Sequence, residues 1–178
     1  MPESLTLEDA GRRRFWSFVT GAGMAAASVL TIRHFFNANF PASIFAGSFC
    51  DLSTFFNCDS SAFSSIAHFW GVPMGYFGLL VGGLVVLGAL FPSAAFERSN
   101  KFLSLFNALG VVGLFIYSVF FLKTLCLLCT GYYVFSLWGF FLFWKHGLAK
   151  GVPSVRHLAV FACVGLAGAY GFHVFYHA

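Results

Sequence analysis

The chain has 178 residues and a formal net charge of +4, with 59% hydrophobic and only 9% charged residues. Soluble globular domains use about one-quarter charged residues, so this composition excludes a soluble domain and predicts an integral membrane protein. A helix needs about 20 mostly apolar residues to cross a bilayer. Five runs meet that requirement and predict an all-α fold with five spans: Phe15–Phe36, Val72–Phe91, Phe102–Leu122, Leu125–Trp144 and Leu158–Tyr176.

The basic residues predict the orientation of these spans. Residues 1–14 form a polar tail, and residues 15–178 form a single membrane domain. Under the predicted topology, eight of the ten basic residues lie on the same side as the tail: Arg12, Arg13, Arg14, Arg98, Lys101, Lys145, Lys150 and Arg156. By the positive-inside rule the N-terminus is cytoplasmic and the C-terminus is outside. Because these residues are dispersed over three inner segments, the charge predicts no nucleic-acid partner.

A cleaved export signal is the alternative interpretation of the first apolar run. The sequence Ala25-Ala26-Ala27 is similar to a cleavage site, and the preceding arginines are similar to a twin-arginine signal. The apolar stretch continues past these alanines to Ile32 and beyond. It is therefore longer than the apolar core of about 7–15 residues in a usual signal peptide.

The predicted outer loop, residues 37–71, contains no lysine or arginine and is rich in Phe and Ser. Within residues 60–70, an apolar helical face would carry Phe63, Ile66, Ala67 and Trp70. We expect a short amphipathic helix there, capped by Asp59 or Ser60 and lying on the membrane surface as a lid.

Short connections predict which spans are neighbours. The segment Pro92–Lys101 joins the second and third spans, and a tighter turn at Lys123-Thr124 joins the third and fourth. Thr124 is the predicted N-cap of the fourth span, which seats Cys126 in the first turn, where the helix N-terminus stabilises a thiolate. Small residues in the second and third spans predict close helix contact: Gly78, Gly82, Gly83, Gly88, Ala108, Gly110 and Gly113.

Four cysteines share the predicted outer face, where disulfides persist: Cys50, Cys58, Cys126 and Cys129. The last two are three residues apart and therefore share one face of a helix, as does Tyr133 four residues further on. One pair can exchange with a soluble protein and the other with a molecule in the membrane, which predicts a relay of two dithiols. The fifth cysteine, Cys163, is expected to be a small buried hydrophobe in the last span.

Three alternatives remain for the outer cysteines: structural disulfides, a four-thiolate zinc site, and incidental thiols on a structural scaffold. A disulfide within C-x-x-C closes a small ring and is more often redox-active. The C-x₇-C spacing is unlike the usual spacing of zinc ligands, so no metal is predicted. Acidic residues are scarce and absent from the predicted spans, which argues against ion-coupled transport and excludes a carboxylate-pair hydrolase.

A longer motif carries a resemblance to a known family. From Cys50 to Gly78 the chain reads CDLSTFFNCDSSAFSSIAHFWGVPMGYFG, and CLLC follows about fifty residues later. The F-N-C-D sequence, the serine six residues past the second cysteine, the G-V-P sequence and the C-x-x-C pair resemble the vitamin K epoxide reductase family, in particular its bacterial members. The resemblance covers essentially the whole chain. It implies a four-helix bundle around a quinone pocket, with a fifth transmembrane helix at its side.

The resemblance also implies roles for the cysteines. Cys129 would face the quinone ring and form a thiolate or a transient adduct with it. Cys126 would take electrons from Cys58 by disulfide exchange, and Cys50 would form the mixed disulfide with a soluble thiol protein.

Two hydroxyl residues, Ser64 and Tyr133, would donate hydrogen bonds to quinone carbonyl oxygens. The quinone would be ubiquinone, menaquinone or a phylloquinone-like molecule. Four further outer residues could tune a thiolate or contact the quinone, although an ordinary position at the membrane interface is favoured for each: Arg33, His34, His68 and Lys123.

Two departures from the family pattern bear on the reaction. Many bacterial relatives carry a thioredoxin-like domain after the last span, whereas this chain stops at Ala178, so we expect a separate thioredoxin-fold oxidase of the DsbA type as partner. Met74 stands near the place of an asparagine that binds the quinone in the animal branch, which favours disulfide generation over epoxide reduction. The alternative is an enzyme whose main product is the reduced quinone or vitamin K.

We expect the protein to lie in a bacterial inner membrane with its cysteines on the periplasmic side. The endoplasmic reticulum membrane is the alternative.

Overall fold

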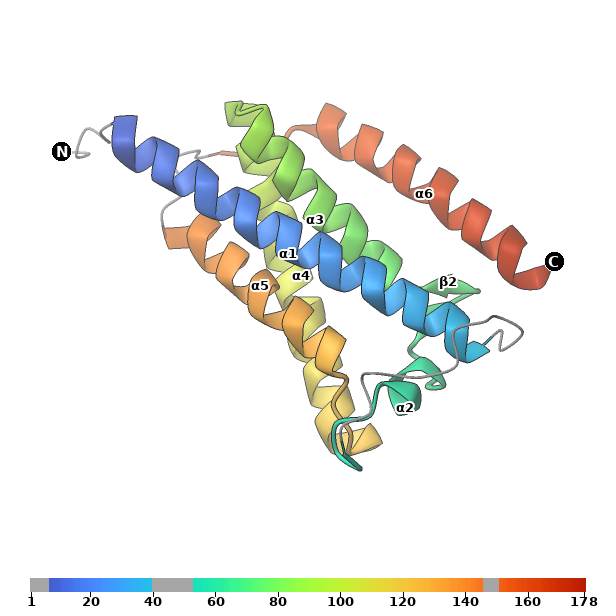
Figure 1. Ribbon diagram of the computed structural model, residues 1–178. Helices are drawn as coiled ribbons and strands as arrows, with labels where there is room; N and C mark the ends of the chain where they lie inside the picture. The colour runs from blue at the N-terminus through green and yellow to red at the C-terminus, as the bar shows by residue number, and fades with distance from the viewer. Residues whose placement is uncertain (1–6, 40–52, 146–150) are drawn as a thin grey trace.

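The computed structural model describes residues 7–39, 53–145 and 151–178. The described chain is an all-α membrane bundle in which four long helices pack together and a fifth lies at their side (Figure 1). The bundle consists of α1 (Leu7–Asn39), α3 (Met74–Leu90), α4 (Ala94–Tyr117) and α5 (Leu127–Lys145), and α6 (Val155–His177) is the fifth helix. Four helical stretches are long and apolar enough to cross a membrane, and α3 is an apolar helix of 17 residues. The protein is therefore a multi-pass membrane protein.

The closest helix pair, α1 and α3, meets through glycine. A Cβ atom added to Gly21 would lie 2.9 Å from the backbone nitrogen of Val86, and one added to Gly82 would lie 2.8 Å from that of Ala25. Each helix therefore presents a flat strip to the other, and this contact allows the backbones to approach closely. The predicted close contact is confirmed at Gly82.

Other glycines of the predicted contact strips behave differently. Gly78 lies against Ser28 and Tyr132, and Gly88 lies against Asn100, as predicted. Three glycines have open space beside them, so the predicted helix contact is wrong there: Gly83, Gly110 and Gly113.

Polar side chains join the helices at the end that contains the basic tail. Arg13 on α1 and Glu97 on α4 form an ion pair of 2.6 Å, and both side chains are largely buried. The Asn100 amide donates to the Leu84 carbonyl oxygen of α3, and Ser93 caps α4 by accepting the Phe96 amide N–H. These contacts fix three helices at one end and leave the other end to be closed by the loop.

The third span ends in an irregular turn that directs the chain into α5. A single π-helical turn, η1 (Ser118–Leu122), follows α4 and ends at Lys123, whose backbone is left-handed with φ 54°. Such π-helical turns often lie at functional sites. Here the turn places Ser118 and Leu122 in the wall of a cavity beside the cysteines.

The outer loop contains a helix, but the predicted helix at residues 60–70 is wrong. The observed helix, α2, covers Cys58–Ala62 and is capped by Asn57, whose side-chain oxygen accepts the Ser60 amide N–H. A two-stranded hairpin follows, with β1 (His68–Phe69) antiparallel to β2 (Val72–Pro73). Its tip needs positive φ at Trp70 and Gly71, 51° and 79°, and a helix cannot accommodate those values.

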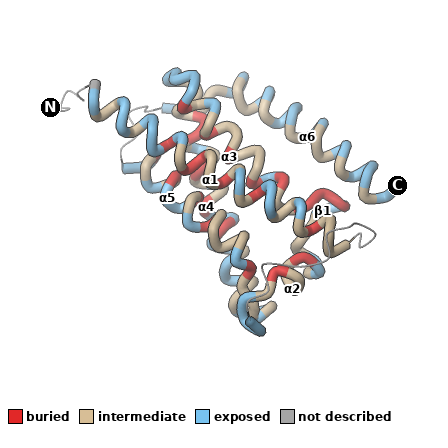
Figure 2. Tube along the Cα trace, in the orientation of Figure 1, coloured by how far each residue is buried: buried red, intermediate tan, exposed pale blue. Residues whose placement is uncertain are grey.

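The buried residues gather between the four bundle helices and under the loop, whereas α6 contributes none (Figure 2). The α6 helix joins the bundle through a hydrogen bond from the Tyr76 hydroxyl to the Gly165 carbonyl oxygen. Near its C-terminal end, Phe172 and Tyr176 also pack against aromatic rings of α1 and the hairpin. Cys163 is exposed on α6, so the expectation of a buried thiol there is wrong. It lies on the outside of the bundle, where a membrane protein faces lipid.

Candidate active site

Backbone pairing brings the loop and the start of α5 together. Phe56 and Leu125 form a parallel β-bridge. The backbone N–H of Asn57 donates to the Leu125 carbonyl oxygen at 3.1 Å, and the backbone N–H of Leu125 donates to the Phe55 carbonyl oxygen at 2.7 Å. A cysteine follows each paired segment in the sequence. The two sulfur atoms, of Cys58 and Cys126, consequently lie 3.0 Å apart, and both residues are almost completely buried.

The cysteines of this site are in different chemical states. Cys58 is disulfide-bonded, whereas Cys126 and Cys129 are thiols. Exchange begins with the attack of a thiolate on a disulfide sulfur, so a thiol sulfur 3.0 Å from Cys58 has the separation required for that step. Cys50 lies outside the described residues, and its role stays a prediction.

Cys126 also caps α5, so the prediction that Thr124 is the N-cap is wrong. Cys126 immediately precedes the helix, and its sulfur accepts the Cys129 amide N–H at 3.4 Å. This contact, from the cap side chain to the third helical residue, is the one made by an N-cap. Unpaired N–H groups and the dipole at a helix start stabilise a thiolate, so the geometry favours reactivity at this sulfur.

Two cavities meet at Cys129. The outer cavity, of about 70 Å³, is lined by Cys58, Cys126 and Cys129 beneath the loop. The deep cavity, of about 300 Å³, lies between α1, α3, α4 and α5 and contains Cys129 in its wall. Both cavities are also lined by the same five further residues: Thr31, Met74, Gly75, Leu114 and Tyr133. Cys129 therefore lies between the sulfur pair and the apolar interior.

The two predicted hydroxyl residues lie at these cavities. Tyr133 lines both, and the Ser118 hydroxyl is its hydrogen-bond partner. Ser64 lines the outer cavity, but its hydroxyl donates to the Ser61 carbonyl oxygen at 2.8 Å. Donation from Ser64 to a bound molecule would require that bond to be exchanged. Contact of either residue with a quinone stays a prediction.

The structure adds hydroxyl groups that the sequence interpretation missed. Ser61 in the outer cavity and Ser28 in the deep cavity have buried side-chain oxygens without a hydrogen-bond partner among the described residues. The Thr31 hydroxyl, one helical turn from Ser28, donates to the Ala27 carbonyl oxygen at 2.8 Å, and Thr31 lines both cavities together with Cys129. A spacing of three residues on α1 was the available signal for Ser28 and Thr31, but serine and threonine are too common in membrane helices for it to be informative.

A polar network lies deeper in the bundle. The Tyr132 hydroxyl donates to the Asn107 side-chain oxygen at 2.7 Å, and the Asn107 amide donates to the Ser136 hydroxyl. Asn107 and Tyr132 line the deep cavity. This network joins α4 to α5 and supplies polar groups to an otherwise mostly apolar wall.

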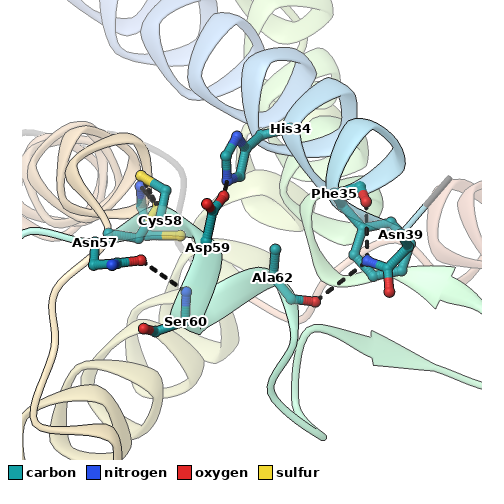
Figure 3. Close-up of polar contacts among 10 residues, drawn as sticks. His34, Phe35, Asn39, Asn57, Cys58, Asp59, Ser60 and Ala62 are labelled. Carbon is teal, nitrogen blue, oxygen red and sulfur yellow. Dashed lines mark hydrogen bonds and ion pairs between the residues drawn. The ribbon is translucent and has the colours of Figure 1, made fainter. Parts of the chain in front are cut away.

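An ion pair connects α1 with the loop helix. His34 Nε2 lies 3.0 Å from an Asp59 carboxylate oxygen, and Figure 3 shows the carboxylate reaching from α2 toward the imidazole. His34 lines the outer cavity, and Asp59 directly follows Cys58. The same figure shows Asn39 beside the end of α2, where its side-chain amide donates to the Ala62 carbonyl oxygen at 3.4 Å.

Among the described residues, no group of three or more His, Cys, Asp or Glu side chains is arranged to hold a metal ion.

Comparison with known proteins agrees with the motif and the geometry. A search of curated proteins finds no match to this chain. The family model described as the vitamin K epoxide reductase family matches residues 15–144, which include α3, α4, most of α1 and α5, the outer loop and the C-x-x-C pair but not α6. The match covers well over half of the chain. The chain therefore belongs to the vitamin K epoxide reductase family.

Proposed function

We propose that this protein oxidises the thiols of a separate thioredoxin-fold protein and passes the electrons to a membrane quinone, which generates disulfides in the partner. Family membership supports a quinone-linked thiol oxidoreductase. The observation that carries the proposal is the sulfur arrangement: Cys126 lies 3.0 Å from the disulfide-bonded Cys58, and Cys129 lies in the wall of the deep cavity.

The proposed electron path has two exchanges. Two thiols of the partner reduce the Cys50–Cys58 disulfide, the loop pair. Cys50 is the sulfur that forms the mixed disulfide with the partner. Cys58 then attacks Cys126 within an oxidised Cys126–Cys129 pair, the core pair, so the loop pair is reoxidised as the core pair is reduced. The core pair then returns to the disulfide and gives two electrons to the quinone, and the two protons that quinone reduction also requires come from the loop thiols.

The deep cavity has the properties of a quinone site. Its volume of about 300 Å³ is at the lower end for ligand pockets, which are mostly apolar with a few polar groups. Phe77, Leu103 and Phe106 contribute apolar walls, and Tyr133 lines the cavity together with Cys129. Hydroxyl donors stabilise negative charge that develops on a carbonyl oxygen during reduction. The buried Ser28 and Ser61 hydroxyls are additional candidates for this role, because each lacks a partner among the described residues.

The direction of the reaction follows from the partner. A strongly oxidising thioredoxin-fold protein has a potential of about −120 mV, so its reoxidation needs an acceptor of higher potential, and a membrane quinone supplies one. The positive-inside rule supports a cytoplasmic N-terminus and cysteines on the outer side, for which the bacterial inner membrane and its periplasm are the proposed setting.

A purified-protein assay tests this function. The protein is mixed with a reduced thioredoxin-fold protein and a quinone, and the quinone absorbance is followed together with the disulfide content of the partner. We expect one quinone to be reduced for each disulfide formed.

A variant tests the role of Cys129 in the same assay. Cys129→Ser removes the sulfur that faces the cavity and should abolish quinone reduction while the fold is retained. Cys163→Ser is the matched control, because Cys163 is exposed on α6 away from both cavities, and it should turn over at the wild-type rate. Normal turnover by the Cys129→Ser variant would refute the assigned path.

A further inference from the structure

An acid–base pair lies beside the outer cavity, and its histidine is part of the cavity wall. His34 on α1 and Asp59 on α2 form an ion pair of 3.0 Å, and the His34 side chain is only 15% exposed. Histidine is the usual side chain for proton transfer in proteins, and here a carboxylate oxygen lies at its ring nitrogen. We propose that the His34–Asp59 pair carries one proton from the loop thiols to the quinone during electron transfer.

The position of the pair supports this assignment. His34 lines the same cavity as Cys58, Cys126 and Cys129. Asp59, whose side chain is 43% exposed, directly follows Cys58 in α2, so the carboxylate and the exchanging sulfur belong to one helical turn. On α1, Thr31 lies one helical turn before His34 and lines both cavities together with Cys129. One face of α1 therefore serves both ends of the sulfur path.

The chemistry of the exchange requires such a group. A thiol must lose its proton before it attacks a disulfide, and the cavity that holds these sulfurs is mostly apolar. The Cys58 thiol gives its proton to His34, and the Cys58 thiolate forms a bond to the Cys126 sulfur as the Cys126–Cys129 bond breaks. Cys129 leaves as a thiolate. Cys50 then displaces Cys126 from Cys58, and its proton passes to Cys126.

The protons balance when the core pair, Cys126 and Cys129, is reoxidised. Cys126 and Cys129 give two electrons to the quinone as their sulfurs rejoin in a disulfide. One of the two protons required for the quinol comes from the Cys126 thiol, and the other comes from the His34 imidazolium. His34 is then neutral again, and no proton has to enter from solvent during the cycle. This inference rests on the proposed function and adds the proton path to it.

The test follows the exchange step without quinone. Oxidised protein is mixed with dithiothreitol, quenched with acid at timed intervals and labelled with a maleimide, and peptide masses report when the loop pair and the core pair become thiols. His34→Gln keeps a hydrogen-bond donor for Asp59 but cannot carry a proton. We expect it to slow the appearance of core thiols by about 100-fold relative to loop thiols, the lower end for a lost acid–base group. Free imidazole should accelerate His34→Ala.

A matched variant separates proton transfer from structural support. Asn39→Ala removes another contact between α1 and α2, the bond to the Ala62 carbonyl oxygen, and it carries no titratable group. We expect its exchange rate to stay within about threefold of the wild type, because the hydrogen bonds it removes are individually weak and lie outside the proton path. A His34→Gln rate within threefold of the wild type, or an Asn39→Ala rate as slow as that of His34→Gln, would overturn the proton role.

Wild-type turnover with quinone and a reduced thioredoxin-fold protein is measured on the same preparation. If the wild type transfers no electrons to quinone, the proposed function fails. If the wild type turns over and His34→Gln keeps the wild-type exchange rate, the proposed function stands and the proton role alone is wrong.

Discussion

Cys126 has two tasks that depend on the same sulfur atom. It caps α5 by accepting the Cys129 amide N–H, and it lies 3.0 Å from Cys58. The cap fixes the orientation of the Cys126 side chain toward the loop, while the Phe56–Leu125 bridge fixes the loop against the helix start. The separation of the sulfurs is therefore held by backbone contacts on both sides. A side chain positioned in this way needs no large motion before it reacts.

Asn107 provides a prediction at the residue scale. Asn107→Ala removes the bonds to Tyr132 and Ser136, and hydrogen bonds between membrane helices average about 0.6 kcal/mol and reach about 1.7 kcal/mol. We expect a stability loss of roughly 1 kcal/mol, measured by unfolding in detergent micelles. We also expect a higher KM for the quinone, because Asn107 and Tyr132 line the deep cavity.

Asn100→Ala is the matched control for that prediction. Its amide donates to the Leu84 carbonyl oxygen, and the residue lies outside the deep cavity. It should lose similar stability without a change in KM. Equal KM values for the two variants would show that the Asn107 network does not support the quinone site.

At the element scale, two adjacent glycines on α3 have opposite surroundings. A Cβ atom at Gly82 would lie 2.8 Å from the Ala25 backbone nitrogen of α1, whereas one at Gly83 would meet nothing within 4 Å. The Gly82 position determines how closely α1 and α3 pack. That contact in turn positions Thr31 and His34 of α1 against the cavity walls, so the helix spacing is part of the site.

Alanine substitution at the two glycines tests this contact. Gly82→Ala forces α1 and α3 apart and should destabilise the protein by about 1–3 kcal/mol, the usual cost of overpacking. Gly83→Ala should be neutral or stabilising by up to about 1 kcal/mol, because alanine favours the helix and has room there. Unfolding in detergent micelles measures both. Equal stability of the two variants would contradict the close approach at Gly82.

The extent to which sequence predicts this fold differs between elements. Long apolar runs predict the helices because bilayer thickness imposes their length, and the cysteine motif predicts which loop lies near the C-x-x-C pair. The predicted helix at residues 60–70 fails because helical periodicity does not report backbone strain at Trp70 and Gly71. The Thr124 cap fails because the Phe56–Leu125 bridge, a tertiary contact, determines where α5 begins.

The site contacts that the sequence did not predict depend on tertiary packing. His34 and Asp59 are 25 positions apart in the sequence and meet only because α2 packs under the end of α1. The Ser61 and Ser28 hydroxyls are informative only because they are buried without a partner among the described residues. Neither fact is encoded in local spacing.

At the scale of the whole molecule, the two ends of the bundle carry different chemistry. One end holds the Arg13–Glu97 ion pair and most of the basic residues, and the other holds the sulfurs, the loop and the cavity. This distribution of charge is the one that the positive-inside rule expects when the basic end of the bundle is cytoplasmic and the cysteines are on the opposite side of the membrane. In the proposed orientation, the proposed electron path runs from the outer surface into the membrane without crossing it.

Reporter fusions test this orientation. Alkaline phosphatase requires an oxidising compartment for its disulfides. A fusion after Ala178 should therefore be active, and a fusion after Lys145 should be inactive. A fluorescent protein that fails to mature outside the cytoplasm should give the reverse pattern. The opposite result for both reporters would place the cysteines on the cytoplasmic side and contradict the proposed partner.

The measurement that tests the central claim most directly is the disulfide formed by two chosen cysteines. In the Cys50→Ala, Cys129→Ser double variant, Cys58 and Cys126 remain as the outer sulfurs, and we expect mild oxidation to join them in nearly every molecule, as detected by peptide mass. In the control double variant, Cys50→Ala with Cys126→Ser, no bond between Cys58 and Cys129 should form. A Cys58–Cys126 bond that fails to form, with both thiols still open to alkylation, would contradict the sulfur relay.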